Sequence, residues 1–297
     1  MTTSSPAPLL SPQMLEQLER LELVSRKIFR GRLQGERRSR RKGQSVEFAD
    51  FRNYVPGDDV RFIDWNLYAR LDRLFLKVFL EEEDLHFFVA IDASASMDFG
   101  TPTKLQFAKQ LAAALGFIGL CRTDRVKLET LGESVRRPGP VLRGRRDLWR
   151  MLEYLAAITP NHNVPFAESL REFCLRNRGQ GVLVLISDLM DKQGFEQGLR
   201  FLLTQPFDVY VVQVLSREEM APDLRGDLKL VDSEDADFTE ITASQPLLQR
   251  YQRNLAAFLQ SAKDYCTHRG MTYLMSASDA SVEQMVTGYL RTRGLVR

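Results

Sequence analysis

The sequence predicts a doubly wound α/β fold with a mostly parallel sheet, because strand-like and helix-like segments alternate over most of its 297 residues. Residues 86–91 and 181–186 are continuous apolar runs, which is typical of strands that are buried on both faces of a sheet. The composition, with 44% hydrophobic and 27% charged residues, is that of a globular protein that is long enough to bury a sizeable core.

The expected elements follow one another in regular order from residue 86 onward. Strands are expected at 86–91, 126–131, near Val135, 181–186, 209–215 and 271–275. Helices are expected at 101–121, 148–158, 166–176, 195–203, 246–268 and 282–290. Thr101 and Pro102 indicate the start of the first helix, as an N-cap and a first-turn proline. A polar, hairpin-like insertion is expected at 228–241.

The chain before residue 85 differs in composition, and we divide it into two parts. Residues 1–42 are expected to form a disordered tail, an amphipathic helix and a basic segment, in which Arg26 to Lys42 carry nine basic residues and one acid. Residues 43–84 are rich in aromatic side chains and predict a small ordered N-terminal lobe. Residues 85–297 then form the α/β domain.

Charge and cysteine content restrict the cellular setting. The formal net charge of +2 favours no particular partner, and three widely spaced cysteines predict neither a disulfide framework nor a thiolate zinc site. The first residues do not resemble a secretory signal. The longest nearly apolar run, 111–121, is shorter than the roughly 20 residues that span a bilayer. We therefore expect a cytoplasmic protein without a membrane span.

Oxygen-bearing side chains follow two of the buried strands. Asp92 comes directly after the first core strand, with Ser94 and Ser96 at alternate positions, and Asp188 follows the strand at 181–186. In doubly wound sheets ligands bind outside the carboxyl ends of the strands, and alternate side chains of an extended loop turn to the same side. Such oxygens are the ligands that Mg²⁺, Mn²⁺ or Ca²⁺ prefers. The alternative is that they cap the loops.

Two motifs carry a resemblance to known families. The segment 91–97, Ile-Asp-Ala-Ser-Ala-Ser-Met, resembles the metal-ion-dependent adhesion site of von Willebrand factor A domains, and Ile186-Ser187-Asp188 resembles the distal aspartate of that site. Segments 45–52 and 56–65, followed by Ala69-Arg70, resemble the signature that precedes this loop in the bacterial domain-of-unknown-function 58 (DUF58) family. The resemblance runs from about Gly43 to the end of the chain.

The resemblance implies a von Willebrand factor A-like fold and a bound Mg²⁺, with Mn²⁺ or Ca²⁺ as alternatives. In that pattern the two serines and the aspartates hold the cation, a threonine from a third loop completes the site, and a partner's carboxylate takes the open position. Aligning the third loop places Val164 at the threonine position, so Asn163 and Thr159 are the remaining candidates there. The family commonly accompanies MoxR-type AAA ATPases, which implies an adaptor or co-chaperone that links such an ATPase to a client protein.

Charged and aromatic residues of the lobe form a second candidate set. Its members are Arg52, Asp58, Asp59, Arg61, Asp64, Trp65 and Arg70. Arginine forks match carboxylates in pairs, so we expect an internal ion-pair network that fastens the lobe to the α/β domain. The alternative is a surface that the ATPase grips.

The sequence predicts a binding protein and not an enzyme. It contains neither a GxxxxGK[ST] phosphate-binding loop nor a GxSxG nucleophile motif. A phosphatase of the haloacid dehalogenase type would need a second acid two residues after Asp92, where the chain has Ser94. The alternative from another class is nucleic-acid binding through the phosphate-attracting segment 26–42. We expect that segment to be a solvated connector.

Overall fold

The computed structural model describes residues 9–23, 47–80, 86–132, 138–160, 164–222, 226–231 and 238–297. The chain divides into two compact units. One comprises Met1–Gly31 and Leu85–Arg297, and the other comprises Arg32–Asp84. We call them the sheet unit and the lobe, and each is described by itself. No helix among the described residues is long and apolar enough to cross a membrane.

A six-stranded sheet forms the centre of the described part of the sheet unit, which confirms the predicted doubly wound α/β fold. The bounds of its strands are β3 His86–Asp92, β4 Arg125–Leu131, β5 Val141–Arg143, β6 Gly181–Ser187, β7 Phe207–Leu215 and β10 Thr272–Ala277. The order across the sheet is β10-β7-β6-β3-β4-β5, and every neighbouring pair is parallel except β4 and β5. The chain therefore leaves β3 in one direction to form β4 and later returns to the other side of β3 to form β6.

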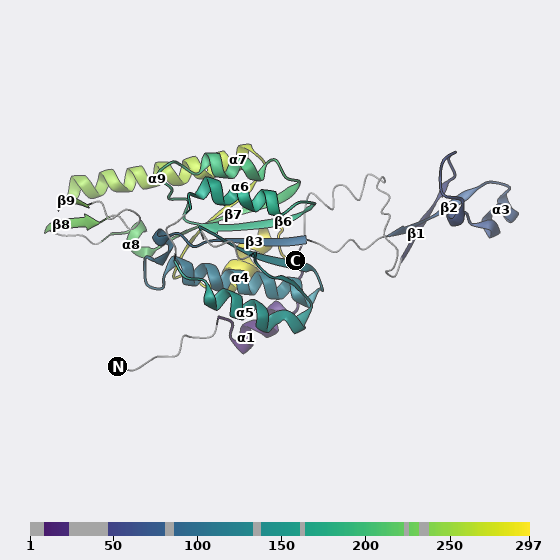
Figure 1. Ribbon diagram of the computed structural model, residues 1–297, viewed down its shortest axis with the longest axis horizontal. Helices are drawn as coiled ribbons and strands as arrows, with labels where there is room; N and C mark the ends of the chain where they lie inside the picture. Colours follow the sequence, from purple (N-terminus) through teal and green to yellow (C-terminus); the bar gives the residue numbers. More distant parts are fainter. Residues whose placement is uncertain are drawn as a thin grey trace. The chain divides into compact units, whose positions relative to one another are not determined.

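Helices cover both faces of this sheet (Figure 1). On one face lie α1 Pro12–Leu18, α4 Lys104–Cys121, α5 Leu148–Ala157 and the closing segments α10 Val282–Gln284 and η4 Met285–Leu290. On the other face lie α6 Phe166–Arg176, α7 Glu196–Leu202 and α9 Gln245–His268. Successive β3 side chains divide between the two cores, since Val89 packs in the first and Phe88 in the second. The central strands β3 and β6 are accordingly apolar along nearly their whole length, as burial on both faces of a sheet requires.

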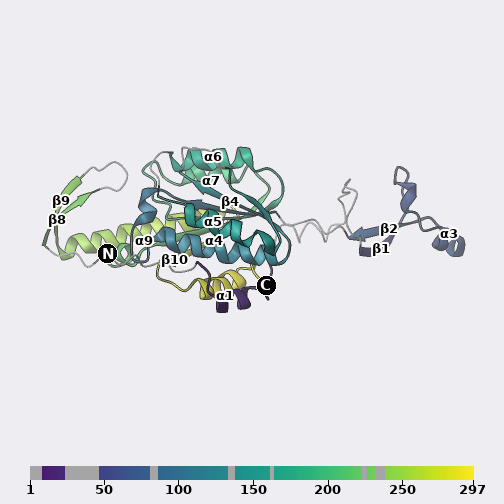
Figure 2. The ribbon, with the colours of Figure 1, turned by 60° about the horizontal axis from the view of Figure 1, so that its bottom comes forward.

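Three expectations about local structure need correction or completion. Helix α4 begins at Lys104, and its N-cap is Thr103, whose hydroxyl accepts from the Gln106 amide, and not Thr101. The insertion expected at 228–241 is a two-stranded sheet of β8 Gly226–Val231 and β9 Phe238–Ala243 beside the start of α9 (Figures 1 and 2). A strand near Val135 falls outside the described residues.

The segment 9–23, which the sequence grouped with the N-terminal tail, contributes to the core of the sheet unit. Leu18 is fully buried in the cluster that surrounds α4. Leu23 forms an antiparallel bridge with Val296, so the N-terminal segment lies against the C-terminal end of the chain (Figure 2). The amphipathic helix expected in this part of the chain is α1, which ends at Leu18.

The lobe is a hairpin with two short helices. Strands β1 Glu47–Asn53 and β2 Phe75–Leu80 pair in an antiparallel ladder, and η1 Val60–Phe62 and α3 Trp65–Leu71 lie between them in sequence. Asp64 caps α3 by accepting hydrogen bonds from the amides of Asn66 and Leu67.

Candidate functional site

The fold brings Asp92 and Asp188 to neighbouring positions on one edge of the sheet. Asp92 is the last residue of β3, and Asp188 follows the last residue of β6, the adjacent strand. The connections from these two strands diverge, and a divergence of this kind opens a crevice at the carboxyl edge of a doubly wound sheet. A pocket of about 240 Å³ lies here, and its lining includes Asp92, Ser94, Val164, Asp188 and Met190. We call it the edge pocket.

Asp92 is buried, and donors from the loop after β3 and from the end of β6 hold both of its carboxylate oxygens. The Ser94 amide donates to Oδ1 at 2.9 Å, and the Ser187 hydroxyl donates to Oδ2 at 2.5 Å. Burial, and then repulsion from Asp188, raise the pKa of Asp92 to about 6. The rise means that two protein donors do not fully compensate the negative charge of this carboxylate.

Ser94 and Ser96 lie at the start of the loop that follows β3. Ser94 precedes the short helix η2 Ala95–Asp98, and its hydroxyl lies 3.1 Å from the hydroxyl of Ser96. Ser94 lines the edge pocket beside Asp92, whereas Ser96 lies within η2, contacts Ser94 and is not part of that lining.

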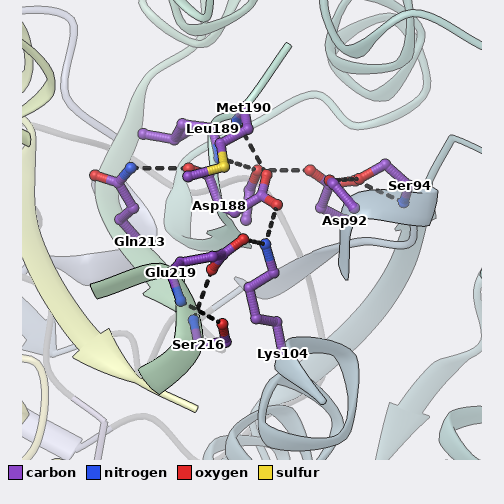
Figure 3. Close-up of polar contacts among 11 residues, drawn as sticks. Asp92, Ser94, Lys104, Asp188, Leu189, Met190, Gln213, Ser216 and Glu219 are labelled. Carbon is purple, nitrogen blue, oxygen red and sulfur yellow. Dashed lines mark hydrogen bonds and ion pairs between the residues drawn. The ribbon is translucent and has the colours of Figure 1, made fainter. Parts of the chain in front are cut away.

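Asp188 is fixed by a tight turn and by a buried lysine (Figure 3). The Met190 amide donates to Asp188 Oδ1 at 3.0 Å, and Lys104 Nζ donates to Oδ2 at 2.7 Å. Leu189, between them, has a φ of 60°, a left-handed conformation that is costly for a branched side chain. The turn is supported by the Leu189 amide, which donates to Ser187 Oγ at 2.9 Å.

Lys104 and Glu219 extend this cluster, and the sequence analysis missed both. Lys104 Nζ also contacts Glu219 Oε1 at 2.5 Å, and Glu219 lies in α8 Arg217–Met220 (Figure 3). A signal for each was present. Lys104 is the first residue of a mostly apolar helix, and Ser216 with Glu219 forms the S-x-x-E capping box that begins α8.

The third-loop candidates have different outcomes. Thr159 is exposed and is not part of the lining of the edge pocket, whereas Val164 lines it. Asn163 falls outside the described residues. Among the described residues there is no group of three or more His, Cys, Asp or Glu side chains that could hold a metal ion. A cation in the edge pocket would therefore be held by two carboxylates and by hydroxyl groups.

Comparison with known proteins identifies the family. The model of the family described as "Protein of unknown function DUF58" matches residues 50–260, which is well over half of the chain. The chain belongs to the DUF58 family. Uncharacterized proteins from Mycobacterium bovis and Mycobacterium tuberculosis are 27% identical to it over 252 residues, covering 83% of this chain and 79% of each relative.

Solved structures similar to this DUF58 chain include two bacterial proteins. Conserved hypothetical protein BatB from Bacteroides thetaiotaomicron is 14% identical, covers 70% of this chain and 98% of its own, and has a TM-score of 0.42. A von Willebrand factor type A protein from Catenulispora acidiphila is 14% identical, covers 48% of this chain and 35% of its own, and has a TM-score of 0.34.

The charged residues of the DUF58 lobe pair locally. The two terminal nitrogens of Arg52 donate to the two carboxylate oxygens of Asp58, at 2.8 and 2.7 Å. Arg61 Nη2 lies 2.6 Å from Asp59 Oδ2. The expectation of a network that fastens the lobe to the sheet unit remains a prediction, because these pairs join residues of the lobe itself. Three further members of the set are Asp64, which pairs with Lys77 at 3.1 Å, and the exposed Trp65 and Arg70.

The basic segment 26–42, on which the nucleic-acid alternative depends, lies outside the described residues.

Proposed function

We propose that this DUF58 chain is a cation-dependent protein-binding module whose docking point is the edge pocket. The observation that supports this most directly is the charge balance of the site. The cluster at the site contains one base, Lys104, and three buried or half-buried acids, Asp92, Asp188 and Glu219. Its formal charge is therefore −2 when all four groups are ionised. Asp191 and Lys192 at the rim add one charge of each sign. A divalent cation neutralises the remainder, which is costly to bury uncompensated.

The spacing of the hydroxyl groups supports Mg²⁺ as this cation. Adjacent ligands of an octahedral Mg²⁺ with bonds of about 2.1 Å lie about 3.0 Å apart. The hydroxyl oxygens of Ser94 and Ser96 are 3.1 Å apart. Ca²⁺ takes six to eight oxygen ligands, more than four such residues supply as single ligands, whereas Mg²⁺ usually keeps several water ligands. Mg²⁺ would be held by Asp92, Ser94, Ser96 and Asp188, and it would supply a positive charge that attracts a partner's Asp or Glu.

We propose a binding role and not a catalytic one. The hydroxyl group of Ser94 is hydrogen-bonded to that of Ser96. The described lining of the edge pocket contains no histidine that could activate either serine as a nucleophile. On the ground of the family resemblance, the partners we propose are a MoxR-type AAA ATPase and a client protein, with this chain as the adaptor between them.

Calorimetric titration of the full chain with MgCl₂ or MnCl₂ tests the cation. We expect saturable binding that Asp92→Ala removes, and a rise in unfolding free energy of about 2.7 kcal/mol at a cation concentration of 100 times Kd. Asp98→Ala is the matched control, because Asp98 is exposed in the same loop and is not part of the pocket lining. Wild-type protein that binds neither ion refutes the proposal.

A capture experiment tests the partner. Immobilised wild-type chain should retain the MoxR-type ATPase of the same organism in Mg²⁺ and release it in EDTA, and the Asp92→Ala chain should not retain it. Retention that is indifferent to EDTA and to Asp92→Ala would place the contact elsewhere on the molecule.

A further inference from the structure

Lys104 is the most unusual charged residue in the described part of the sheet unit. Its side chain has no solvent exposure, although lysine is among the residues least often buried. It is also the first residue of α4, where the helix dipole disfavours a positive charge. Neither helix formation nor core packing therefore explains a lysine here. What it contacts are two carboxylates, Asp188 on one side and Glu219 on the other.

Glu219 is held in place independently of Lys104. The Ser216 amide donates to Glu219 Oε2 at 2.7 Å, and the Glu219 amide donates to Ser216 Oγ at 3.1 Å. The Tyr251 hydroxyl, from α9, donates to the Glu219 backbone oxygen at 2.7 Å. The Glu219 carboxylate is thus a fixed anion that shares the lysine ammonium with Asp188.

From these contacts we infer that Lys104 is a positioning residue that lowers the cation affinity of the edge pocket, and that Glu219 offsets this effect. The inference rests on the proposed function. Lys104 occupies Oδ2 of Asp188 and places a positive charge beside any cation that Asp188 binds, so it weakens binding. Glu219 draws part of that charge away and restores affinity.

The pair therefore has effects of opposite sign on affinity. Removing only the Glu219 charge leaves the ammonium to Asp188 alone and changes the local formal charge from −2 to −1. Removing both charges returns it to −2 and frees Oδ2 of Asp188. A purely structural ion pair would not produce this reversal, because both changes would then alter stability and leave affinity unchanged.

The test is Mg²⁺ affinity measured by calorimetry on the full chain for Glu219→Gln and for Lys104→Met/Glu219→Gln. Glutamine also serves in a capping box, so the first change keeps the start of α8. We expect Glu219→Gln to weaken Mg²⁺ binding about tenfold, and the double variant to bind at least as tightly as the wild type. Lys109→Met is the control, since Lys109 lies on the same helix and donates to the Ile158 backbone oxygen.

The outcomes separate the two proposals. If the wild type binds Mg²⁺, Asp92→Ala abolishes binding and Glu219→Gln equals the wild type, the role of Lys104 is refuted while the cation site stands. The same holds if the double variant is as weak as Glu219→Gln. If the wild type does not bind Mg²⁺, both proposals fail. Thermal unfolding without cation confirms that each variant is folded before its affinity is interpreted.

Discussion

In the described part of the sheet unit, two clusters of buried charged side chains differ in how their charges are balanced. Glu129 in β4 is 1% exposed and contacts Lys127 Nζ at 2.9 Å and Arg176 at 3.2 Å, with Asn177 as a further donor. One acid therefore meets two bases. Around the edge pocket the proportion is reversed, because Asp188 and Glu219 share Lys104, and the donors to Asp92 are the neutral groups of Ser94 and Ser187.

This difference in charge balance distinguishes a structural cluster from the proposed binding site. A buried carboxylate that is fully paired holds its surroundings together and has no need of a further cation. A buried group of carboxylates with too few bases destabilises the fold unless a cation binds to it. The raised pKa of Asp92 reflects this uncompensated charge. The first cluster should therefore respond to mutation in stability alone, and the second in both stability and binding.

The largest expected effect is on the fully paired cluster. Glu129→Gln removes the charge that holds Lys127 and Arg176, and we expect the free energy of unfolding to fall by about 3 kcal/mol, near the lower end for a broken buried pair because Arg176 reaches solvent. Urea denaturation measures this loss. Magnesium affinity of the variant should equal that of the wild type. A variant with native stability and altered affinity would reverse the roles of the two clusters.

The next effect has the opposite sign. Asp92→Asn removes the poorly compensated charge, and without divalent cation at pH 7.5 we expect the variant to be more stable than the wild type by on the order of 2 kcal/mol. The pKa of Asp92 is higher in the folded chain than in the unfolded chain. The wild type therefore loses stability as the pH rises from about 4, where Asp92 ionises in the unfolded chain, to about 6, where it ionises in the folded chain.

Urea denaturation at pH 4 and pH 7.5 checks this prediction. The stability difference between Asp92→Asn and wild type should be near zero at the lower pH and full at the higher pH. Saturating Mg²⁺ should stabilise the wild type and leave Asp92→Asn unchanged. An equal difference at both pH values would mean that the Asp92 charge is not the cause.

The sequence predicted the fold well because the main signal, apolar runs such as 86–91 and 181–186, directly reflects burial on both faces of a sheet. The placement of Asp92 and Asp188 at the same edge of the sheet was also predictable, since they lie at the carboxyl ends of parallel strands. That β3 and β6 are neighbours was not, because strand order depends on which side of β3 the chain returns to.

The contact between Lys104 and Glu219 was beyond sequence reasoning for a related reason. They lie 115 residues apart, in α4 and α8, and the local pattern at each position predicts no more than the start of a helix. Only the fold places Lys104 between Asp188 and Glu219. The helix start at Thr103 instead of Thr101 shows the same limit on a smaller scale, since two nearby threonines offer equivalent caps.

The smallest expected effect comes from the lobe and provides the reference for the other two. Arg52 pairs with Asp58 through two hydrogen bonds, but the Arg52 side chain is 46% exposed. Water screens the Arg52 end of the pair, and removing the arginine opens the Asp58 carboxylate, which is 6% exposed, to solvent, so Arg52→Ala should cost on the order of 1 kcal/mol by urea denaturation. Asp58 also accepts from the Val55 amide at 2.9 Å, which keeps its turn in place when the arginine is removed. A loss as large as that of Glu129→Gln would mean that the pair is shielded from water, as it would be if the lobe used this surface to dock.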